Sequence, residues 1–525
     1  MASGNYGTTA SGKTTISAPA CVSSAIAVGA TDDVTDTVTS WSSSSSQLAL
    51  LAPGSSVLSS VSVAQTSPFP ISVACPAPFS AGQCASESGT SMATPHAAAA
   101  FAVAKSANPA MGVDDLLGLL RSTGKPLTDA ANGLVTPRVQ LDAAVRPPTF
   151  HPLAPARILD TRDGTGGVVG PVGATTTITT TVAGRGGVPS SGVSAVVLNV
   201  TAAAPSAPSF VTVFPFGSTL PLASNLNLEK GVNRANLVVA KVGPAGRVSL
   251  YNNSGSVHLV ADVAGWFDAG GASDTGARYR PVTPSRVLDT RDGTGLPGGT
   301  PTRVAGGTSV SFDPTTACGF AGATAVALNV TAAGPTLPSH VTVWPAGTAM
   351  PGVSNVNFNA GRDTPNLVVV KTGAGGEVSL FNNSGDVDLV ADLAGCFAAD
   401  ASAPGRVVSV RPARVLDTRT GVGGTSGPVG TTSFDLALAG RGGVPSTGVT
   451  AVVLNLTATE TAASSHFTVW PAGQPQPTAS NVNFVAGQTV ANLVVVKLGA
   501  GGAVSIANNA GTTQVVADVA GWITG

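Results

Sequence analysis

The stretch GTSMATPH, residues 89–96, decides how the first part of the chain is interpreted. Its opening Gly-Thr predicts a turn, and the small residues from His96 to Ala104 predict a helix packed inside a domain. Ser91 would then stand at the start of this helix, where free N–H groups and the helix dipole favour a developing oxyanion. Pro95 fits only in a first helical turn, because its ring removes a backbone donor. The alternative interpretation is a Ser-rich loop before an Ala-rich helix.

Two more segments stand before this motif in the chain. Residues 3–7 read Ser-Gly-Asn-Tyr-Gly, and residues 52–54 read Ala-Pro-Gly after an apolar run at residues 48–51. Between them, residues 24–30 predict a buried strand. Together with GTSMATPH, these segments resemble the subtilisin-like serine proteases, the subtilases.

The resemblance implies an acyl-enzyme mechanism on Ser91 and hydrolysis of a protein or peptide substrate. It also implies that the side chain of Asn5 donates to the oxyanion, with the Ser91 N–H as second donor. No cofactor is needed for this chemistry, and no metal or calcium site can be identified from these residues.

Serine proteolysis also needs a base and a carboxylate that orients the base. In subtilases both precede the serine in the chain, but no histidine precedes Ser91 here. His96 follows it in the same helix and is expected to be packed, and Asp32 and Asp33 are expected in a solvated turn. We therefore expect residues 1–145 to be the C-terminal part of an α/β subtilisin-like domain, inactive by itself. The five histidines are His96, His151, His258, His340 and His466.

Composition sets outer limits on the function. The chain has 525 residues, a net charge of −1 and 10% charged residues, so neither nucleic acid nor an anionic membrane is an expected partner. The longest apolar stretch, Ala97 to Ala104, is too short to span a bilayer. No signal peptide follows Met1, but the resemblance implies that an export signal would precede this part of the domain. We therefore expect an extracellular location.

Three copies of one sequence pattern occupy the rest of the chain. The motif Arg-Ile/Val-Leu-Asp-Thr-Arg at residues 157–162 recurs at 286–291 and 414–419, and the same later motifs follow in each copy. Alternation of Val196, Leu198 and Val200 with less apolar neighbours predicts strands, about eight per copy. We expect three all-β modules of β-sandwich type, joined as separate beads on a string. Their predicted bounds are residues 150–268, 279–398 and 406–525.

The copies resemble repeats of secreted actinobacterial proteins, which are often appended to hydrolases. The resemblance implies adhesion or wall association, with cell-wall polysaccharide as the partner. Repeated polar residues admit two interpretations: a sugar-binding face, or bonds that lock strand ends and turns. In the first copy these residues are Arg157, Asp160, Arg162, Asn225, Asn227 and Asp262.

The five cysteines fit an oxidising compartment. Cys75 and Cys84 lie at the two ends of a short loop and could form a disulfide. Cys21 is not part of that pairing. Cys318 and Cys396 are both in the second copy, and at the corresponding places both other copies carry valine and tryptophan. We therefore predict a Cys318–Cys396 disulfide in place of a Val–Trp contact. The alternative is two independent buried cysteines.

Together these observations predict a secreted subtilisin-like serine endopeptidase, present as its C-terminal catalytic part with three β repeats. The alternative is a non-catalytic extracellular protein that binds carbohydrate or cell wall and carries a degenerate protease remnant. The sequence encoded upstream of Met1 distinguishes them, because only the enzyme needs the missing histidine and aspartate there.

Overall fold

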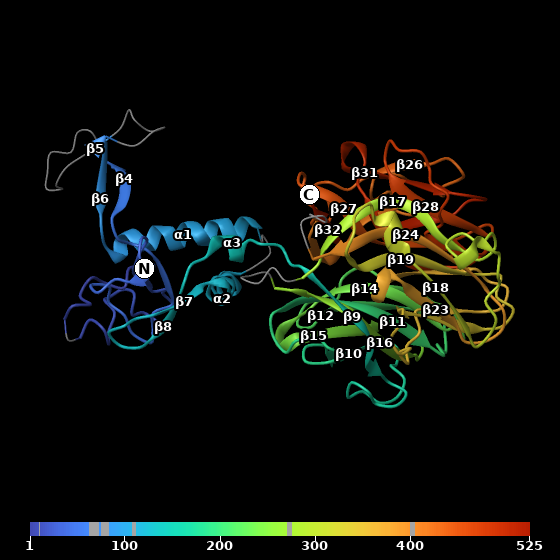
Figure 1. The fold of residues 1–525 in the computed structure, drawn as a ribbon, viewed down its shortest axis with the longest axis horizontal. Helices are drawn as coiled ribbons and strands as arrows, with labels where there is room; N and C mark the ends of the chain where they lie inside the picture. Colours follow the sequence, from blue (N-terminus) through green and yellow to red (C-terminus); the bar gives the residue numbers. More distant parts are fainter. Residues whose placement is uncertain (10, 62–72, 75–82, 108–111, 270–275, 400–404) are drawn as a thin grey trace. The chain divides into compact units, whose positions relative to one another are not determined.

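The computed structural model describes residues 1–9, 11–61, 73–74, 83–107, 112–269, 276–399 and 405–525. The described chain is mostly β-structure and divides into two compact units. We name them the N-terminal unit, Met1–Arg146, and the β unit, the described residues from Pro147 to Gly525. Figure 1 colours the first from blue to teal and the second from green to red.

The N-terminal unit combines parallel strands with helices. Its strands are β1 (Val28–Asp32), β2 (Thr37–Val38), β3 (Leu50–Pro53), β4 (Val57–Val61), β5 (Val73–Ala74), β6 (Gln83–Glu87), β7 (Lys125–Thr128) and β8 (Val135–Arg138). Its helices are α1 (Thr90–Ala107), α2 (Val113–Thr123) and α3 (Leu141–Ala144). The main sheet has the order β2-β1-β3-β8-β7, with β1, β3 and β8 parallel, and a smaller sheet has the order β4-β6-β5.

Helix α1 covers the parallel strands through its smallest side chains. Ala93 and Ala97 are buried and belong to one apolar cluster with Val28 and Ala30 of β1 and Ala52 of β3. Alanine at these positions lets the helix approach the sheet closely. This packing places the start of α1 beside the C-terminal ends of β1 and β3.

The elements predicted around the serine motif are present, with shifted bounds. Strands β1 and β3 begin a few residues later than the predicted ranges, 24–30 and 48–51. The predicted helix begins at Thr90, so Pro95 lies in the second turn and the prediction of a first-turn proline is wrong. Because proline has no N–H, the carbonyl of Ser91 lacks the donor that the fourth residue along normally supplies.

The described part of the β unit contains three repeats of eight strands each, as the sequence predicts. Repeat 1 has β9 (Phe150–Asp160), β10 (Thr176–Thr181), β11 (Val193–Ala203), β12 (Ser209–Pro215), β13 (Leu226–Leu228), β14 (Arg234–Lys241), β15 (Arg247–Asn252) and β16 (His258–Asp268). Repeat 2 has β17 (Arg278–Asp289), β18 (Thr308–Phe312), β19 (Ala323–Ala333), β20 (Ser339–Pro345), β21 (Val356–Phe358), β22 (Thr364–Lys371), β23 (Val378–Asn382) and β24 (Asp388–Ala398). Repeat 3 has β25 (Val407–Asp417), β26 (Phe434–Ala437), β27 (Val449–Thr459), β28 (Ser465–Pro471), β29 (Val482–Phe484), β30 (Val490–Lys497), β31 (Ala503–Asn508) and β32 (Gln514–Thr524).

Each repeat forms two four-stranded antiparallel sheets. In repeat 1 the sheet that we call inner has the order β14-β11-β16-β9, and the outer sheet has the order β10-β15-β12-β13. Repeats 2 and 3 have the same two orders. Buried side chains of both sheets, such as Leu198 and Leu250 in repeat 1, join one apolar cluster per repeat.

A fourth apolar cluster belongs to all three repeats. It collects side chains from equivalent positions of the inner sheets, including Leu237, Leu367 and Leu493. The sheets therefore surround a common axis in a propeller-like arrangement. The prediction of separate beads on a string is wrong, because the second face of each inner sheet, which carries Val197 and Leu237 in repeat 1, is buried against the other repeats.

Asparagine side chains close a ring around this axis. Asn199 of repeat 1 donates through Nδ2 to the carbonyl of Ser354 in repeat 2 at 2.6 Å. The same bond runs from repeat 2 to repeat 3 and from repeat 3 back to repeat 1, at Asn329–Ser480 (2.5 Å) and Asn455–Ser224 (2.6 Å). The succession of bonds therefore returns to its starting repeat.

A second asparagine of each repeat completes the ring. Asn366 donates to Oδ1 of Asn199 at 2.9 Å and to the carbonyl of Asn355 at 2.6 Å. Its Oδ1 accepts the N–H of Leu237 at 3.2 Å. The equivalent bonds are made by Asn236 and Asn492. The bonds among them that join different repeats exist only while the three repeats stay together.

Glu229 adds a charged link between the repeats. Its Oε2 accepts a bond from Arg362 of repeat 2 at 3.0 Å, and its Oε1 accepts one from Gln488 of repeat 3 at 2.7 Å. Burial alone would raise the pKa of this carboxyl, but the bonds from Gln488 and Arg362 hold it below its ordinary value. One carboxylate therefore serves all three repeats.

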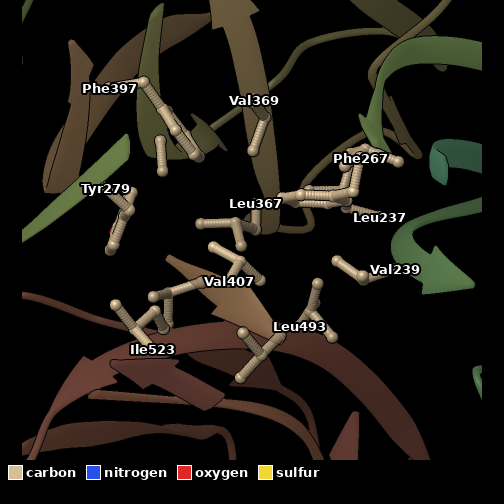
Figure 2. Close-up of a pocket in the computed structure, with 14 residues that line it drawn as sticks. Leu237, Val239, Phe267, Tyr279, Leu367, Val369, Phe397, Val407, Leu493 and Ile523 are labelled. Atoms are coloured by element: carbon tan, nitrogen blue, oxygen red, sulfur yellow. The ribbon is translucent and has the colours of Figure 1, made fainter. Parts of the chain in front are cut away.

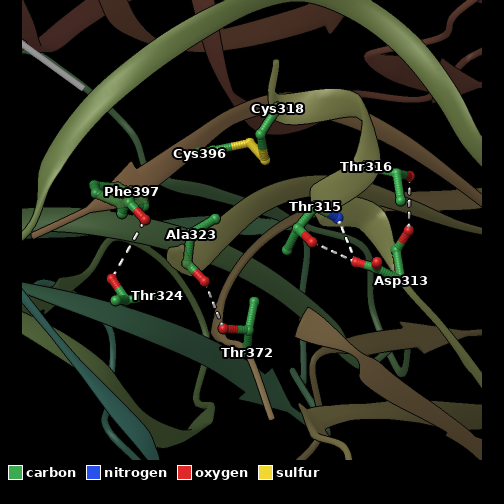
Figure 3. Close-up of a disulfide and its surroundings, with 9 residues drawn as sticks. All are labelled: Asp313, Thr315, Thr316, Cys318, Ala323, Thr324, Thr372, Cys396 and Phe397. Atoms are coloured by element: carbon green, nitrogen blue, oxygen red, sulfur yellow. Dashed lines mark hydrogen bonds between the residues drawn. A yellow bond between two sulfur atoms is a disulfide. The ribbon is translucent and has the colours of Figure 1, made fainter. Parts of the chain in front are cut away.

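Cys318 and Cys396 form a disulfide in repeat 2 (Figure 3). Both are buried, and their Cα atoms are 5.9 Å apart. Cys318 ends a 3-10 helix at Pro314–Cys318, and Cys396 lies on β24. At the equivalent positions of repeat 1, Val188 and Trp266 belong to one apolar cluster. The cross-link therefore takes the place of an apolar contact.

The other cysteines are less informative. Cys21 is exposed and free. Cys75, the predicted partner of Cys84, lies outside the described residues.

Candidate functional site

Ser91 is the second residue of helix α1, and its side chain is exposed. No described residue forms a hydrogen bond with its hydroxyl or accepts one from its backbone N–H. The first N–H groups of a helix have no acceptor within the helix, and the helix dipole makes this end electropositive. Ser91 therefore presents a hydroxyl and an amide donor together at a site suited to a developing negative charge.

The side chain of Asn5 is held against the same helix start. Its Oδ1 accepts two hydrogen bonds from Thr90, one from the backbone N at 2.9 Å and one from Oγ1 at 3.0 Å. Oγ1 of Thr90 in turn accepts the N–H of Gly4 at 3.1 Å. With Oδ1 occupied, Asn5 offers its NH2 group, and a Cβ atom built on Gly89 would lie 3.1 Å from Nδ2. The amide of Asn5 and the N–H of Ser91 are thus two donors at one helix start.

Close packing explains the glycines at positions 54 and 89. The N–H of Gly89 donates to the carbonyl of Gly54 at 2.8 Å. A Cβ atom on Gly54 would lie 2.7 Å from Cβ of Ala30 and 2.8 Å from the carbonyl oxygen of Gly89. The Ala-Pro-Gly turn at residues 52–54 therefore contacts the serine motif directly and leaves no room for a side chain.

Ser43 holds the segment around Asn5 in place, a role that the sequence does not predict. Its N–H donates to the carbonyl of Gly4 at 2.8 Å, and its Oγ accepts the N–H of Tyr6 at 3.1 Å. Its carbonyl accepts a bond from Oγ of Ser3 at 2.7 Å. Composition assigns a Ser-rich run to an exposed loop, whereas Ser43 is only 1% exposed. Only its partners, which are distant in sequence, reveal its role.

His96 and Asp32 each form hydrogen bonds close to their own place in the chain. His96 is the sole histidine in residues 1–146, and its ring is exposed, so the prediction of a packed histidine is wrong. Its Nδ1 lies 2.9 Å from the carbonyl oxygen of Met92, so the ring donates to its own helix. Asp32 caps a turn by accepting the N–H of Thr35 at 2.9 Å, which confirms the predicted solvated turn.

The charged residues repeated in the β unit form ion pairs within each repeat. Nε of Arg157 lies 2.9 Å from Asp262, and Nη1 lies 3.1 Å from Asp160, so the pair ties β9 to β16. Arg162 contacts Asp160 at 2.7 Å and, with Arg157, keeps the pKa of that carboxyl low. Burial raises the pKa of Asp262. The same pairs are made by Arg286, Asp289, Arg291, Asp392, Arg414, Asp417, Arg419 and Asp518.

The repeated asparagines of the predicted sugar-binding face also bind within the protein. Oδ1 of Asn225 accepts the N–H of Val213 at 2.6 Å, and Oδ1 of Asn227 accepts a bond from Ser224 at 3.3 Å. Of the residues named for that face in repeat 1, Arg162 keeps the most exposed side chain, at 51%. This geometry matches the structural interpretation of these residues.

Among the described residues, no group of three or more His, Cys, Asp or Glu side chains could hold a metal ion. Among the helices that can be described, none is long and apolar enough to cross a membrane.

Comparison with known proteins gives one family match. The model of the subtilase family matches residues 1–139, about a quarter of the chain. This match supports a subtilase, and therefore a serine peptidase, relationship for the N-terminal unit. A search among curated proteins found no match.

Several solved structures are similar to parts of the chain. A cold-adapted subtilisin-like serine proteinase is 28% identical over 26% of this chain and 44% of its own, with a TM-score of 0.20. A protease from Pseudoalteromonas arctica is 24% identical over 27% of this chain and 40% of its own, with a TM-score of 0.22. A chain from a triple jelly roll turret of an archaeal virus is 10% identical over 72% of this chain and 91% of its own, with a TM-score of 0.16. TM-scores this low establish no shared fold, and the chain spans less than half the length of the two proteases.

Proposed function

We propose that the N-terminal unit is the nucleophile-bearing part of a secreted subtilisin-like serine endopeptidase. In this proposal Oγ of Ser91 gives its proton to the base and attacks the carbonyl carbon of a peptide bond. The C–N bond then breaks, the amine product leaves with that proton, and an acyl-enzyme remains. The N–H of Ser91 and the Nδ2 group of Asn5 stabilise the oxyanion of the tetrahedral intermediate. Water then hydrolyses the acyl-enzyme and releases the second product.

The observation that carries the proposal is the pair of bonds from Thr90 to Oδ1 of Asn5. These bonds orient the amide so that its donor end is available beside an exposed serine at a helix N-terminus. A Ser-rich loop before a helix would not need this orientation. The match of the subtilase model to residues 1–139 points the same way.

The base and its orienting carboxylate are assigned to a segment that would precede Met1 in a longer protein. No histidine precedes Ser91 in this sequence, and His96 is bonded to its own helix. Without a base, Ser91 keeps its proton and most of the rate enhancement is lost. We therefore expect this chain alone to be inactive toward peptides.

For the β unit we propose three β-sandwich repeats that attach the enzyme outside the cell. Support comes from the two-sheet construction of each repeat and from the disulfide in repeat 2, which fits an oxidising compartment. Attachment to cell-wall polysaccharide stays a prediction, because the repeated polar residues are engaged in internal bonds.

The test compares the chain of residues 1–525 with a version extended by the in-frame upstream codons, each assayed on a mixed peptide library. We expect turnover only from the extended protein. Ser91→Ala should abolish this turnover, and Asn5→Ala should lower kcat by roughly 10²- to 10³-fold, the loss typical of one oxyanion donor, for which a subtilisin is the standard example.

Two outcomes would contradict the proposal. An upstream segment that lacks histidine and aspartate would favour the alternative, a binding protein with a protease remnant. Turnover by residues 1–525 alone that Ser91→Ala removes would instead show that the base lies within this chain.

A further inference from the structure

Strand β14 carries a buried arginine three residues before the leucine that it places at the common axis. That leucine, Leu237, lines the axis together with Leu367 and Leu493, as Figure 2 shows. Arg234 starts the same strand, about 10 Å away along it. It is only 8% exposed. Because a guanidinium carries five N–H donors and a permanent charge, its burial requires partners.

The protein supplies few of the partners that Arg234 needs. Within the described chain, its side chain forms one hydrogen bond, from Nη2 to Oε1 of Glu229 at 3.3 Å. The same oxygen also accepts a bond from Gln488 of repeat 3. The repeated Arg157 differs, because its guanidinium gives three hydrogen bonds to two carboxylates. Nε and Nη1 of Arg234 are therefore available to a further acceptor.

A second arginine brings more positive charge to the same carboxylate. Arg362 of repeat 2 donates through Nη1 to Oε2 of Glu229 at 3.0 Å, and its side chain is 38% exposed. Burial lowers the pKa of Arg234, Glu229 raises it, and the charge of Arg362 lowers it again. The two guanidinium groups therefore repel each other. Two positive charges share one negative charge, which leaves one positive charge of this group without compensation.

The three charged residues are not part of the repeated pattern. Repetition accounts for the asparagine ring, which occurs in every repeat, but at the positions of Glu229, Arg234 and Arg362 the other repeats are uncharged. The equivalent residues are Asn359 and Val485 for Glu229, Thr364 and Val490 for Arg234, and Val232 and Gln488 for Arg362. The excess charge is therefore a feature of this one place.

We propose that Arg234 and Arg362 form a binding site for an oxyanion, either a phosphate or a carboxylate group. Nε and Nη1 of Arg234 would donate to its oxygens, together with nitrogens of Arg362 that Glu229 does not engage. Guanidinium groups bind such oxyanions through paired, charge-assisted hydrogen bonds. The anion would compensate the remaining positive charge. Because Arg362 and Glu229 keep 38% and 31% of their side chains exposed, the anion can enter from solvent.

Binding would be coupled to the assembly of the repeats. Arg234 belongs to repeat 1 and Arg362 to repeat 2, so the two donors lie together only when these repeats are in contact. A ligand that binds the folded state alone stabilises it by mass action. Phosphate or a carboxylate should therefore raise the melting temperature of the β unit.

The experiment uses the chain of residues 1–525, with inorganic phosphate and acetate as probes at constant ionic strength in chloride. Calorimetric titration should show saturable binding of one phosphate per chain, and phosphate should raise the melting temperature more than chloride does. Acetate is titrated in the same way, and the tighter of the two probes identifies the oxyanion group. No saturable binding of either probe overturns the proposal.

Two variants copy the uncharged residues of the other repeats. Arg234→Val introduces the residue at position 490, and Arg362→Gln introduces the residue at position 488. Each removes charge-assisted hydrogen bonds and should lower the affinity for phosphate by roughly tenfold or more. Because either variant tests the site, one remains if the other does not fold. Unchanged affinity in a folded variant overturns the proposal.

A third variant distinguishes an anion site from ion pairs that only hold the repeats together. Glu229→Gln keeps an acceptor oxygen and removes the negative charge that competes with the ligand, so it should raise the affinity for phosphate severalfold. A structural role alone predicts no gain in affinity. Lower or unchanged affinity in folded Glu229→Gln contradicts the assignment.

Arg411→Gln is the matched control. It removes the same charge as Arg362→Gln, and Arg411 of repeat 3 also bonds another repeat, through Nη2 to the carbonyl of Thr219 at 3.1 Å. It should leave the affinity for phosphate unchanged. A loss as large as that of Arg362→Gln would show that phosphate responds to net charge alone, which overturns the proposal. None of these outcomes depends on peptidase activity.

Discussion

The N-terminal unit and the β unit differ in how far their polar and apolar groups are covered by other parts of the chain. In the β unit, buried asparagines of one repeat are paired by the next, and the third repeat returns to the first. In the N-terminal unit, Ser91 and Asn5 are oriented but exposed, and helix α1 leaves one face uncovered. That face carries Ala98, Ala99, Ala102 and Val103, all exposed.

The difference shows that a compact unit can still leave an apolar helix face exposed. A small-residue helix such as α1 gains little from its own side chains and depends on burial of both faces. The β unit meets the same need within its own chain, because three copies of one sheet cover each other. The N-terminal unit has no such second and third copy.

The strongest test of this comparison is to separate the two units. Residues 1–146 alone should show no cooperative thermal transition, because the face of α1 that carries Ala98, Ala99, Ala102 and Val103 is exposed. Residues 147–525 alone should unfold in one sharp transition. Calorimetry and circular dichroism on the two fragments measure both results. A sharp transition for residues 1–146 would break the comparison and favour a complete small domain.

The disulfide of repeat 2 offers a smaller test within the β unit. It closes a loop with a sequence separation of 78, for which chain entropy gives about 4 kcal/mol. Replacing both Cys318 and Cys396 by alanine should lower the free energy of unfolding by about this amount. The pair Cys318→Val and Cys396→Trp copies the sister repeats and should lose less, because it restores an apolar contact.

Denaturant titration under non-reducing conditions measures these losses. Wild-type protein with added reductant serves as the control for the cross-link alone. Equal losses for the alanine and the Val/Trp pairs would contradict the equivalence of the three repeats at these positions.

The smallest expected effect comes from a single member of the asparagine ring. Asn366→Ala leaves the N–H of Leu237 and the Oδ1 of Asn199 buried without their partner, at a cost of about 3 kcal/mol. Asn383→Ala is the matched control, because Asn383 is exposed and its side chain bonds only Ser384. Equal midpoints for the two variants in urea would show that the ring does not hold the repeats together.

Much of the local structure could be predicted from the sequence. The repeated motifs and the two-residue periodicity around Leu198 gave eight strands per repeat, and comparison of equivalent positions singled out Cys318 and Cys396. These inferences use information within one repeat or between aligned repeats. Residues 89–96 likewise predicted a helix that starts beside the serine.

The closed ring of asparagine bonds could not be predicted, because each residue in it is covered and bonded by another repeat. Val197, Asn199 and Thr201 alternate with more apolar neighbours, which usually indicates a solvent-facing row. All three are in fact buried, since other repeats cover them. The bond from Asn199 to Ser354 joins residues far apart in the sequence, and no spacing rule points from one to the other. For the same reason, the role of Ser43 in holding Asn5 in place could not be predicted from the sequence.

Because the asparagine bonds return from repeat 3 to repeat 1, the number of repeats in the chain is constrained. In a solenoid, one repeat more or less alters the length and leaves every remaining interface intact. Here a fourth repeat would find no open interface, and loss of one would leave an acceptor and a donor exposed at each side of the gap. We therefore expect duplications of these repeats to be tolerated only in sets of three, because three repeats are needed to close the ring of bonds.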